Sequence, residues 1–122
     1  MFKRNWEKYN AVKTIIDWIK FSSKLEARFY NYFKQKEGIE ILELQPTFIL
    51  QPKFKYNWIN IREIKYIADF KINVNWDIYI VDSKWFKTSD FKIKEKMFKY
   101  KFWWENILLV VKSIKELEKI IF

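Results

Sequence analysis

The sequence of 122 residues contains no cysteine and no histidine, only one glycine and only two prolines. Without cysteine the chain has no disulfide, zinc finger or thiolate nucleophile. Without histidine it has no Ser-His-Asp triad and no histidine-dependent nuclease site. A metal ion bound by this protein would therefore have oxygen ligands.

Long apolar runs are missing as well. No segment approaches the roughly 20 apolar residues that cross a membrane, and no signal peptide is evident. We therefore expect an intracellular protein that is not embedded in a membrane. The length fits a single domain over residues 1–122, with residues 1–12 forming a basic N-terminal arm.

Positive charge is present in excess. The chain has 24 lysines and arginines against 15 acidic residues, a net charge of +9 and a pI of about 9.6. This balance favours a polyanionic partner such as nucleic acid, and an anionic membrane surface is the less favoured alternative.

The hydrophobic patterning predicts an α/β fold with the order α-β-β-β-α-β-α, a mixed central sheet and flanking helices. The first helix, at about residues 23–37, opens with a capping box of Ser23 and Glu26 and ends before Gly38. The other expected elements are a short strand at 13–21, strands at 39–50 (interrupted at its proline), 61–74 and 77–84, a helix at 89–101, a central buried strand at 106–112, and a last helix after Ser113.

Two aspartates stand out among the apolar residues of the expected 61–84 hairpin. If Asn75 and Trp76 are the central residues of a tight turn, paired residue numbers sum to 151, and Asp69 faces Asp82. Their Cβ atoms would then lie about 4.5–5.5 Å apart on one sheet face, and Lys84 would point to the same face. Facing carboxylates repel, and a divalent cation such as Mg²⁺, which often takes one or two protein carboxylates, offsets the repulsion. The spacing is therefore consistent with a metal site.

Simpler explanations exist for these residues. Asp69 forming a surface ion pair with Lys84 or Lys71 explains the spacing without a metal, and the capping box alone explains Glu26. Lysines after the hairpin fit a solvated helix face as well as a nucleic-acid surface, and core packing or a loop anchor explains Trp103-Trp104 better than base stacking does.

Six stretches in order resemble the PD-(D/E)xK nuclease superfamily. They are KYNAVKT, IKFSSKLEARFYNYFK, LELQPTFILQPKF, IREIKYIADF, IVDSK and TSDFKIKEKMFKYKF, and they cover about Lys8 to Phe102. The chain is most similar to a family of short, mostly phage-encoded proteins of unassigned function in that group. It more distantly resembles phage endonuclease I type Holliday-junction resolvases. The D-x-K tripeptide alone carries no weight, whereas the ordered set is specific.

The resemblance implies a restriction-endonuclease-like fold and a Mg²⁺- or Mn²⁺-dependent endonuclease that hydrolyses DNA phosphodiester bonds, with branched DNA as an expected substrate. By position it implies Glu26 as the helix acid, Asp69 as the central metal ligand, and Asp82 with Lys84 as the catalytic D-x-K pair. Gln45 matches a recurring glutamine that is structural or supports the ligands. The DNA-binding lysines would be Lys87, Lys92, Lys94, Lys96 and Lys99.

Further expectations concern assembly and setting. A homodimer would suit a symmetric cut, and the location would be the cytoplasm of a bacterium or a phage-infected host cell. The alternatives are a non-catalytic nucleic-acid-binding protein with a vestigial nuclease site, and a basic interaction or virion-associated protein.

Four tryptophans depart from the expected pattern. The family usually has glycine at the position of Trp85, and Trp18, Trp58 and Trp76 each follow Asp or Asn where Asp-Gly or Asn-Gly turns are expected. We hypothesise that UGA codons of an AT-rich gene are written as tryptophan where the source organism reads glycine. The alternative is drift from GGA to UGA in an organism that reads UGA as tryptophan.

Overall fold

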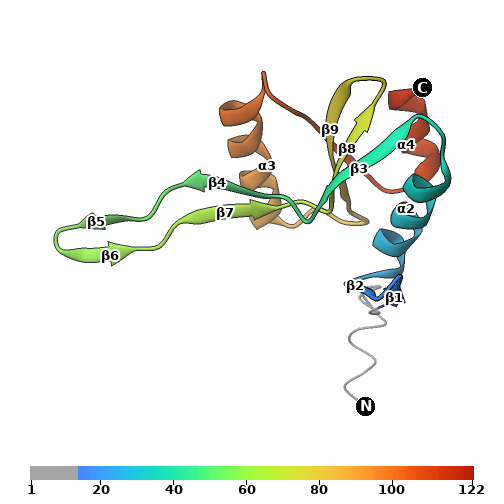
Figure 1. Cartoon of the computed structure of the whole chain (residues 1–122). Coiled ribbons are helices and arrows are strands. Elements are labelled where there is room, and N and C mark those ends of the chain that lie inside the picture. The colour runs from blue at the N-terminus through green and yellow to red at the C-terminus, as the bar shows by residue number, and fades with distance from the viewer. Residues whose placement is uncertain (1–13) are drawn as a thin grey trace, which may run out of the picture.

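The computed structural model describes residues 14–122, so the N-terminal arm predicted at residues 1–12 lies outside the described residues. Within the described part, three helices and a four-stranded mixed sheet form a mixed α/β structure, together with small hairpin sheets (Figure 1). The helices are α2 (Lys24–Gln35), α3 (Ser89–Phe102) and α4 (Ile114–Ile121). The strands are β1 (Thr14–Ile16), β2 (Ile19–Phe21), β3 (Ile39–Leu44), β4 (Thr47–Gln51), β5 (Phe54–Tyr56), β6 (Ile59–Ile61), β7 (Ile64–Ile67), β8 (Phe70–Val74), β9 (Asp77–Ser83) and β10 (Ile107–Val111).

The central sheet has the order β10-β9-β8-β3, with β9 and β10 parallel and the other pairs antiparallel. Helices α2 and α4 pack on one face of the sheet and α3 packs on the other (Figure 1). Alternate residues of β9 enter the two cores, since Val81 faces α2 and Ile80 faces α3. The result is a three-layer arrangement in which both faces of β9 are covered.

Helix α2 begins where the capping box predicts. The Ser23 hydroxyl accepts a hydrogen bond from the amide of Glu26 at 3.1 Å, and the left-handed Gly38, with φ of 86°, follows the helix. The second hydrogen bond of a capping box, from the amide of Ser23 to the carboxylate of Glu26, was also expected, and this expectation is wrong. The carboxylate of Glu26 accepts from the hydroxyl of Ser22 at 2.7 Å and is turned into the protein interior.

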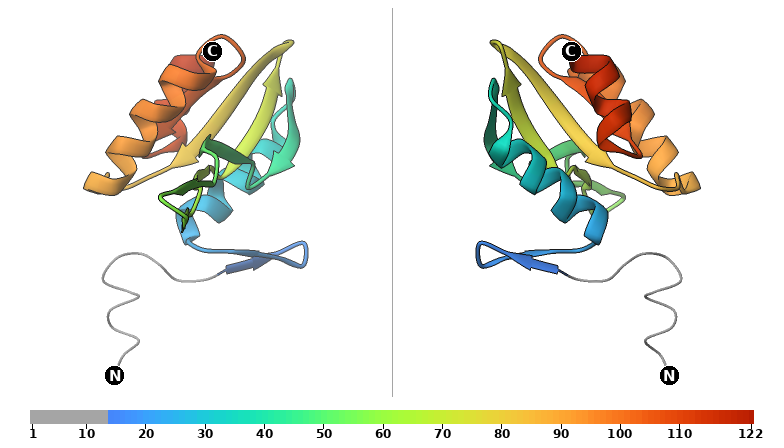
Figure 2. Two further views of the ribbon diagram at one scale, coloured as in Figure 1. Left: turned by 90° about the vertical axis from the view of Figure 1, so that its left-hand side faces the viewer. Right: turned by 90° about the vertical axis from the view of Figure 1, so that its right-hand side faces the viewer.

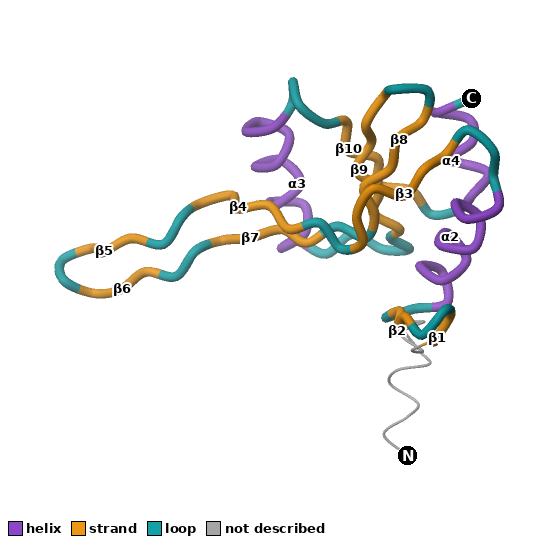
Figure 3. Tube along the Cα trace, viewed as in Figure 1, coloured by secondary structure: helices purple, strands orange, loops and turns teal. Residues whose placement is uncertain are grey.

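Residues 39–74 form one long hairpin that leaves the central sheet (Figure 3). It consists of three successive ladders, β3 with β8, β4 with β7, and β5 with β6. The predicted strands 39–50 and 61–74 are therefore each divided. The first break falls at Gln45, which has φ of 51°, and at Pro46, as the proline predicted.

Two further expectations are corrected by the structure. The segment expected as one short strand at 13–21 is, in its described part, a hairpin of β1 and β2 that lies beside the start of α2 (Figure 2). The strand expected at the centre of the sheet, β10, lies at its edge. Its continuous apolar run reflects helices on both faces rather than neighbouring strands on both edges.

The three Asx-Trp turns have the backbone of a type I′ turn. Both central residues of each turn have positive φ, and the values at Trp18, Trp58 and Trp76 are 65°, 67° and 75°. These three side chains are 98%, 90% and 92% exposed.

No helix in the described part of the chain is long and apolar enough to cross a membrane.

Candidate active site

The predicted register of the β8–β9 hairpin is confirmed as far as Phe70. The ladder runs from Val74 opposite Asp77 to Phe70 opposite Val81, so that paired numbers sum to 151. Asp69 lies just beyond β8 and is not a ladder partner of Asp82. Its amide donates to the carbonyl of Val81 at 3.2 Å instead.

The carboxylate of Asp69 is held by one neighbour on β9. Its Oδ2 accepts hydrogen bonds from the amide of Ser83 at 2.8 Å and from the Ser83 hydroxyl at 2.7 Å. A surface ion pair of Asp69 with Lys84 or Lys71, which would explain the spacing without a metal, is not found among residues 14–122. Asp69 is thus fixed beside Asp82 by hydrogen bonds rather than by a cation.

Asp82 is the most deeply buried acid of the site, with 1% of its surface exposed. The hydroxyl of Tyr66 donates to its Oδ2, and the ammonium of Lys84 lies 3.7 Å from the same oxygen. Burial, followed by the negative charge of Asp69, raises the pKa of Asp82 to about 7, although Lys84 and Tyr66 act in the opposite direction. This carboxyl therefore keeps its proton to a higher pH than an exposed aspartate does.

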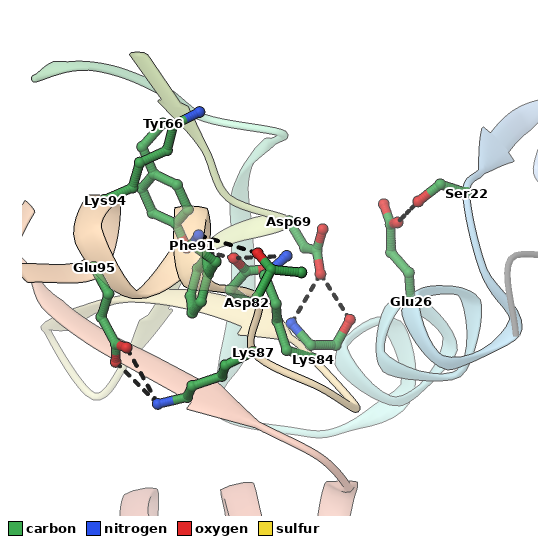
Figure 4. Close-up of polar contacts among 12 residues, drawn as sticks. Ser22, Glu26, Tyr66, Asp69, Asp82, Lys84, Lys87, Phe91, Lys94 and Glu95 are labelled. Carbon is green, nitrogen blue, oxygen red and sulfur yellow. Dashed lines mark hydrogen bonds and ion pairs between the residues drawn. The ribbon is translucent and has the colours of Figure 1, made fainter. Parts of the chain in front are cut away.

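Glu26 approaches the same place from α2 (Figure 4). Burial and then the charge of Asp69 raise the pKa of Glu26, while hydrogen bonds from Ser22 and Gln45 lower it. The structure thus brings Gln45, at the end of β3, to the carboxylate of the helix acid. Figure 4 shows Asp69 between Glu26 and Asp82. We call Glu26, Asp69 and Asp82 the acidic site.

The donor chemistry of the acidic site suits a hard divalent cation, because carboxylate oxygens are the ligands that Mg²⁺ and Mn²⁺ prefer. Within residues 14–122, however, no group of three or more acidic side chains is placed to hold a metal ion. Asp69 and Asp82 remain as a pair, which is enough for Mg²⁺ when waters complete its shell. The residues therefore fit a metal held by two carboxylates, with Glu26 nearby.

A cavity of about 330 Å³ is lined by Tyr66 and Lys84, the two partners of Asp82, although none of the three acids of the acidic site lines it. Three lysines line it, namely Lys65 from β7, Lys84 after β9 and Lys94 from α3. The Lys84 ammonium lies 4.7 Å from the ring centre of Phe91, and its side chain is 31% exposed. A cation that contacts a buried carboxylate on one side and an open, lysine-lined cavity on the other can meet an anionic ligand there.

The predicted DNA-binding lysines are less available than the sequence implied. Lys87 and Lys99 both pair with Glu95 at 3.2 Å, and Lys94 lies 3.6 Å from Asp90. In the described part of the chain Lys92 and Lys96 form no ion pair, and both are exposed on α3. The expected basic face is therefore largely balanced by acids on the same helix.

Sequence reasoning missed the side chains that support the acidic site. Tyr66 is buried, and burial followed by the charge of Asp82 raises the pKa of its hydroxyl. Tyr66 is on β7 and contacts Asp82 of β9, a strand of a different sheet. No local sequence pattern predicts this contact. Ser22 has a visible signal, since it lies four residues before Glu26, whereas Ser83 is visible only as the central residue of D-x-K.

Comparison with known proteins places the chain in a family. Residues 6–118 match the model of DUF1064, described as a protein of unknown function. No curated protein and no solved structure was found to be similar to the chain. Because the match spans most of the sequence, the protein belongs to the DUF1064 family.

Proposed function

We propose that the protein is a metal-dependent nuclease that hydrolyses phosphodiester bonds of DNA, with branched DNA as a favoured substrate. The proposal rests mainly on the buried Asp82, which lies beside Asp69 and Glu26. Lys84 lies between this acidic site and a lysine-lined cavity. Clefts with perturbed carboxyl pKa values and convergent charges are typical of catalytic sites.

The fold of a PD-(D/E)xK nuclease is part of this proposal. It is supported by the order α2, β3, β8, β9, α3, β10, α4, with one acid on the first helix, one just before β8 and one near the end of β9. In this scheme strands β4 to β7 are an insertion between β3 and β8, and the hairpin of β1 and β2 precedes the first helix. Lys84 follows Asp82 at the spacing of the D-x-K pattern.

A purely structural role explains the acidic site poorly. Burying Glu26 and Asp82 removes two carboxylates from water, which is costly unless a cation or a proton compensates. The only cation within 4 Å of these carboxylates in the described residues is Lys84. A Mg²⁺ or Mn²⁺ ion at Asp69 and Asp82, with Glu26 extending the site, would supply the missing positive charge and activate a water.

The chain's own residues have separate tasks in this scheme. Tyr66 and Ser83 fix the orientation of Asp82 and Asp69, so that both carboxylates are positioned before substrate arrives. Lys84 faces the cavity and would neutralise the negative charge that develops on the phosphoryl oxygens. The raised pKa of Asp82 predicts that its metal affinity rises with pH, because the proton competes with the metal ion.

The test is a cleavage assay with four-way-junction, linear, nicked and single-stranded DNA and with RNA, each with Mg²⁺, Mn²⁺ or chelator. Asp82→Asn and Lys84→Ala are expected to abolish metal-dependent cleavage. The matched controls are Asp77→Asn, at the exposed opposite end of β9, and Lys112→Ala, after β10. Cleavage that survives in both site variants, or that persists in chelator, would overturn the assignment.

A second function is favoured by one observation. Asp82 is already engaged by Tyr66 and Lys84, and no group of three acids in residues 14–122 is placed to hold a metal. A nucleic-acid-binding protein with a vestigial nuclease site would show this arrangement. In that case the unmodified protein binds the same DNA substrates without cutting any, and calorimetry detects no Mg²⁺ or Mn²⁺ binding.

A further inference from the structure

The outer part of the long hairpin extends away from the body of the protein (Figures 1 and 3). We call residues 52–63, which contain β5, β6 and their turn, the outer ribbon. All three residues of β5 are exposed, including Tyr56 at 69%, and Ile59 on β6 is 61% exposed. An isolated two-stranded ribbon is only marginally stable in water, and burial of side chains contributes little to the stability of this one.

The body holds the base of this hairpin firmly. The ring of Phe48 on β4 packs edge-on against Phe98 of α3, with 4.8 Å between ring centres. The ammonium of Lys101, at the end of α3, donates to the carbonyl of Ile49 at 2.9 Å. The outer ribbon is therefore presented at a defined place, on the side of the sheet that α3 covers.

The two faces of the outer ribbon differ in chemistry. Its register pairs Phe54 with Ile61, Lys55 with Asn60, and Tyr56 with Ile59, and alternate residues point to opposite faces. One face is therefore apolar and aromatic, and the other is polar. Lys53 and Arg62 lie one residue beyond the last pair of this ladder, where the same alternation would place them on the polar face.

The cations of the polar face are free to bind a ligand. Within residues 14–122, Lys53, Lys55 and Arg62 form no ion pair, unlike Lys87, Lys94 and Lys99 of the α3 region. They line a hollow of about 640 Å³ together with Phe54, Asn60, Ile61 and Glu63, so residues of both faces border it. Three unpaired cations against one acid complement a polyanion, and a two-stranded ribbon has the width that the major groove of DNA admits.

We propose that the outer ribbon is a nucleic-acid-binding arm whose polar face contacts the phosphates of the duplex next to the cleavage position. This inference rests on the proposed function, since it assumes that the acidic site acts on the same nucleic acid. Lys65 of the cavity lies on β7, the strand that continues from the ribbon toward the acidic site. Cations are thus placed both at the cavity and along the projecting ribbon. The apolar face carries Phe54 and Tyr56, which stack on unpaired bases where a branch exposes them.

The test measures binding and cleavage separately. Lys53, Lys55 and Arg62 are changed together to alanine, and the matched control changes Lys112, Lys115 and Lys119, which are exposed near the C-terminus and carry the same charge. Binding to duplex and four-way-junction DNA is measured between 50 and 300 mM salt in chelator. We expect the ribbon variant to bind at least about tenfold more weakly, with a salt slope smaller by about two to three, and the control to change little.

The outcomes separate failure of this inference from failure of the proposed function. Weaker binding by the ribbon variant supports the arm even if the unmodified protein cuts nothing. Equal losses in the ribbon and control variants overturn the arm, because total charge then explains binding. Unchanged DNA binding also overturns it, and a Phe54→Ser/Tyr56→Ser variant that turns a dimer into a monomer would identify the ribbon as an interface between copies instead.

A second inference comes independently from the three type I′ turns. We infer that Trp18, Trp58 and Trp76 occupy positions where the native protein has glycine. A left-handed backbone is unfavourable for tryptophan and free of cost for glycine, and Asp-Gly and Asn-Gly are the preferred type I′ pairs. Nothing in the fold compensates, since all three indoles are almost fully exposed. Trp85 does not have a positive φ, so the backbone at this position does not favour glycine.

The gene and the protein test this second inference. Codons 18, 58 and 76 are expected to be UGA, and peptides from the native organism are expected to contain glycine at each position by mass spectrometry. A UGG codon, or tryptophan in the native peptide, overturns the inference for that residue. Recombinant Trp76→Gly should unfold at higher denaturant concentration, whereas Trp103→Gly, at a right-handed position with φ of −58°, should not.

Discussion

The acidic site and the outer ribbon differ in how far their charged side chains are buried and in whether these side chains have partners. In the acidic site, two of the three carboxylates are buried and Asp69 is half-buried, and each is held by named partners, as Asp69 is by Ser83 and Asp82 is by Tyr66. In the outer ribbon, lysines and aromatic residues are exposed and have no partners among the described residues. Fixed, desolvated charge suits chemistry, whereas unpaired, exposed charge suits binding. A division of labour between the two regions follows from this difference.

The largest expected effect comes from removing the one cation of the acidic site. Lys84→Ala should lower the rate of metal-dependent cleavage by about 10²–10⁴-fold, to or below what a standard cleavage assay detects, while leaving DNA affinity within about threefold, because a single preorganised charge acts mainly on the transition state. Single-turnover kinetics and binding measured on the same substrate check this. Equal losses in rate and affinity would show that Lys84 merely holds DNA and would remove the contrast with the ribbon.

A stability comparison sharpens the structural side of the contrast. Phe98 is fully buried where α3 meets β4 and β7, and Phe98→Ala should cost about 3–5 kcal/mol of unfolding free energy through the cavity it leaves. Tyr56→Ala, in the outer ribbon, should change it by less than about 0.5 kcal/mol. Urea denaturation measures both. A large loss in Tyr56→Ala would mean that the ribbon contributes to the folding core.

The pKa shifts in the acidic site predict that the metal-free protein loses stability as pH rises. The pKa of Asp82 is raised from 3.8 in the unfolded chain to about 7 in the folded protein by burial and then by Asp69. The folded state therefore binds more protons than the unfolded state between these values, and the unfolding free energy falls as pH rises from about 4 to about 7. The raised pKa of Glu26 acts in the same direction.

The variant Asp82→Asn isolates this contribution. Relative to the unmodified protein, it should gain up to about 4 kcal/mol between pH 4 and pH 8 in chelator, since it removes the buried charge. Asp77→Asn, at the exposed end of the same strand, should show no such gain. Denaturation curves at several pH values check this, and parallel pH profiles for Asp82→Asn and the unmodified protein would contradict it.

Local sequence rules are sufficient for the elements that are stabilised locally. The capping serine of α2 and the register of the β8–β9 hairpin depend on neighbours in the chain, and both are predictable from the sequence. The register alone is enough to bring Asp69 and Asp82 near each other. The same turn counting also locates the three type I′ turns, because Asx at the first central position is visible in the sequence.

Features set by tertiary contacts are not predictable in this way. The raised pKa of the Glu26 carboxyl depends on burial and on the charge of Asp69, a residue 43 positions away. The edge position of β10 is hidden because helices on both faces give the same apolar run as a central strand. The i, i+4 spacing of the α3 lysines predicts a shared basic face, but it does not show that Lys87, which precedes the helix, and Lys99 converge on Glu95.

The smallest expected effect concerns the connection between the two regions. Lys101→Met removes the hydrogen bond from α3 to the carbonyl of Ile49 but keeps most of the aliphatic side chain, so global stability should fall by no more than about 1 kcal/mol. Because β4 leads into the outer ribbon, amide hydrogen exchange in β4 and β7 should nevertheless become faster, and DNA affinity should fall by about twofold to threefold. Lys119→Met, an exposed lysine on α4, is the control and should change neither. Unaltered exchange in β4 and β7 of Lys101→Met would mean that the aromatic contacts of Phe48 alone position the ribbon, and the binding role of the ribbon would then be independent of this lysine.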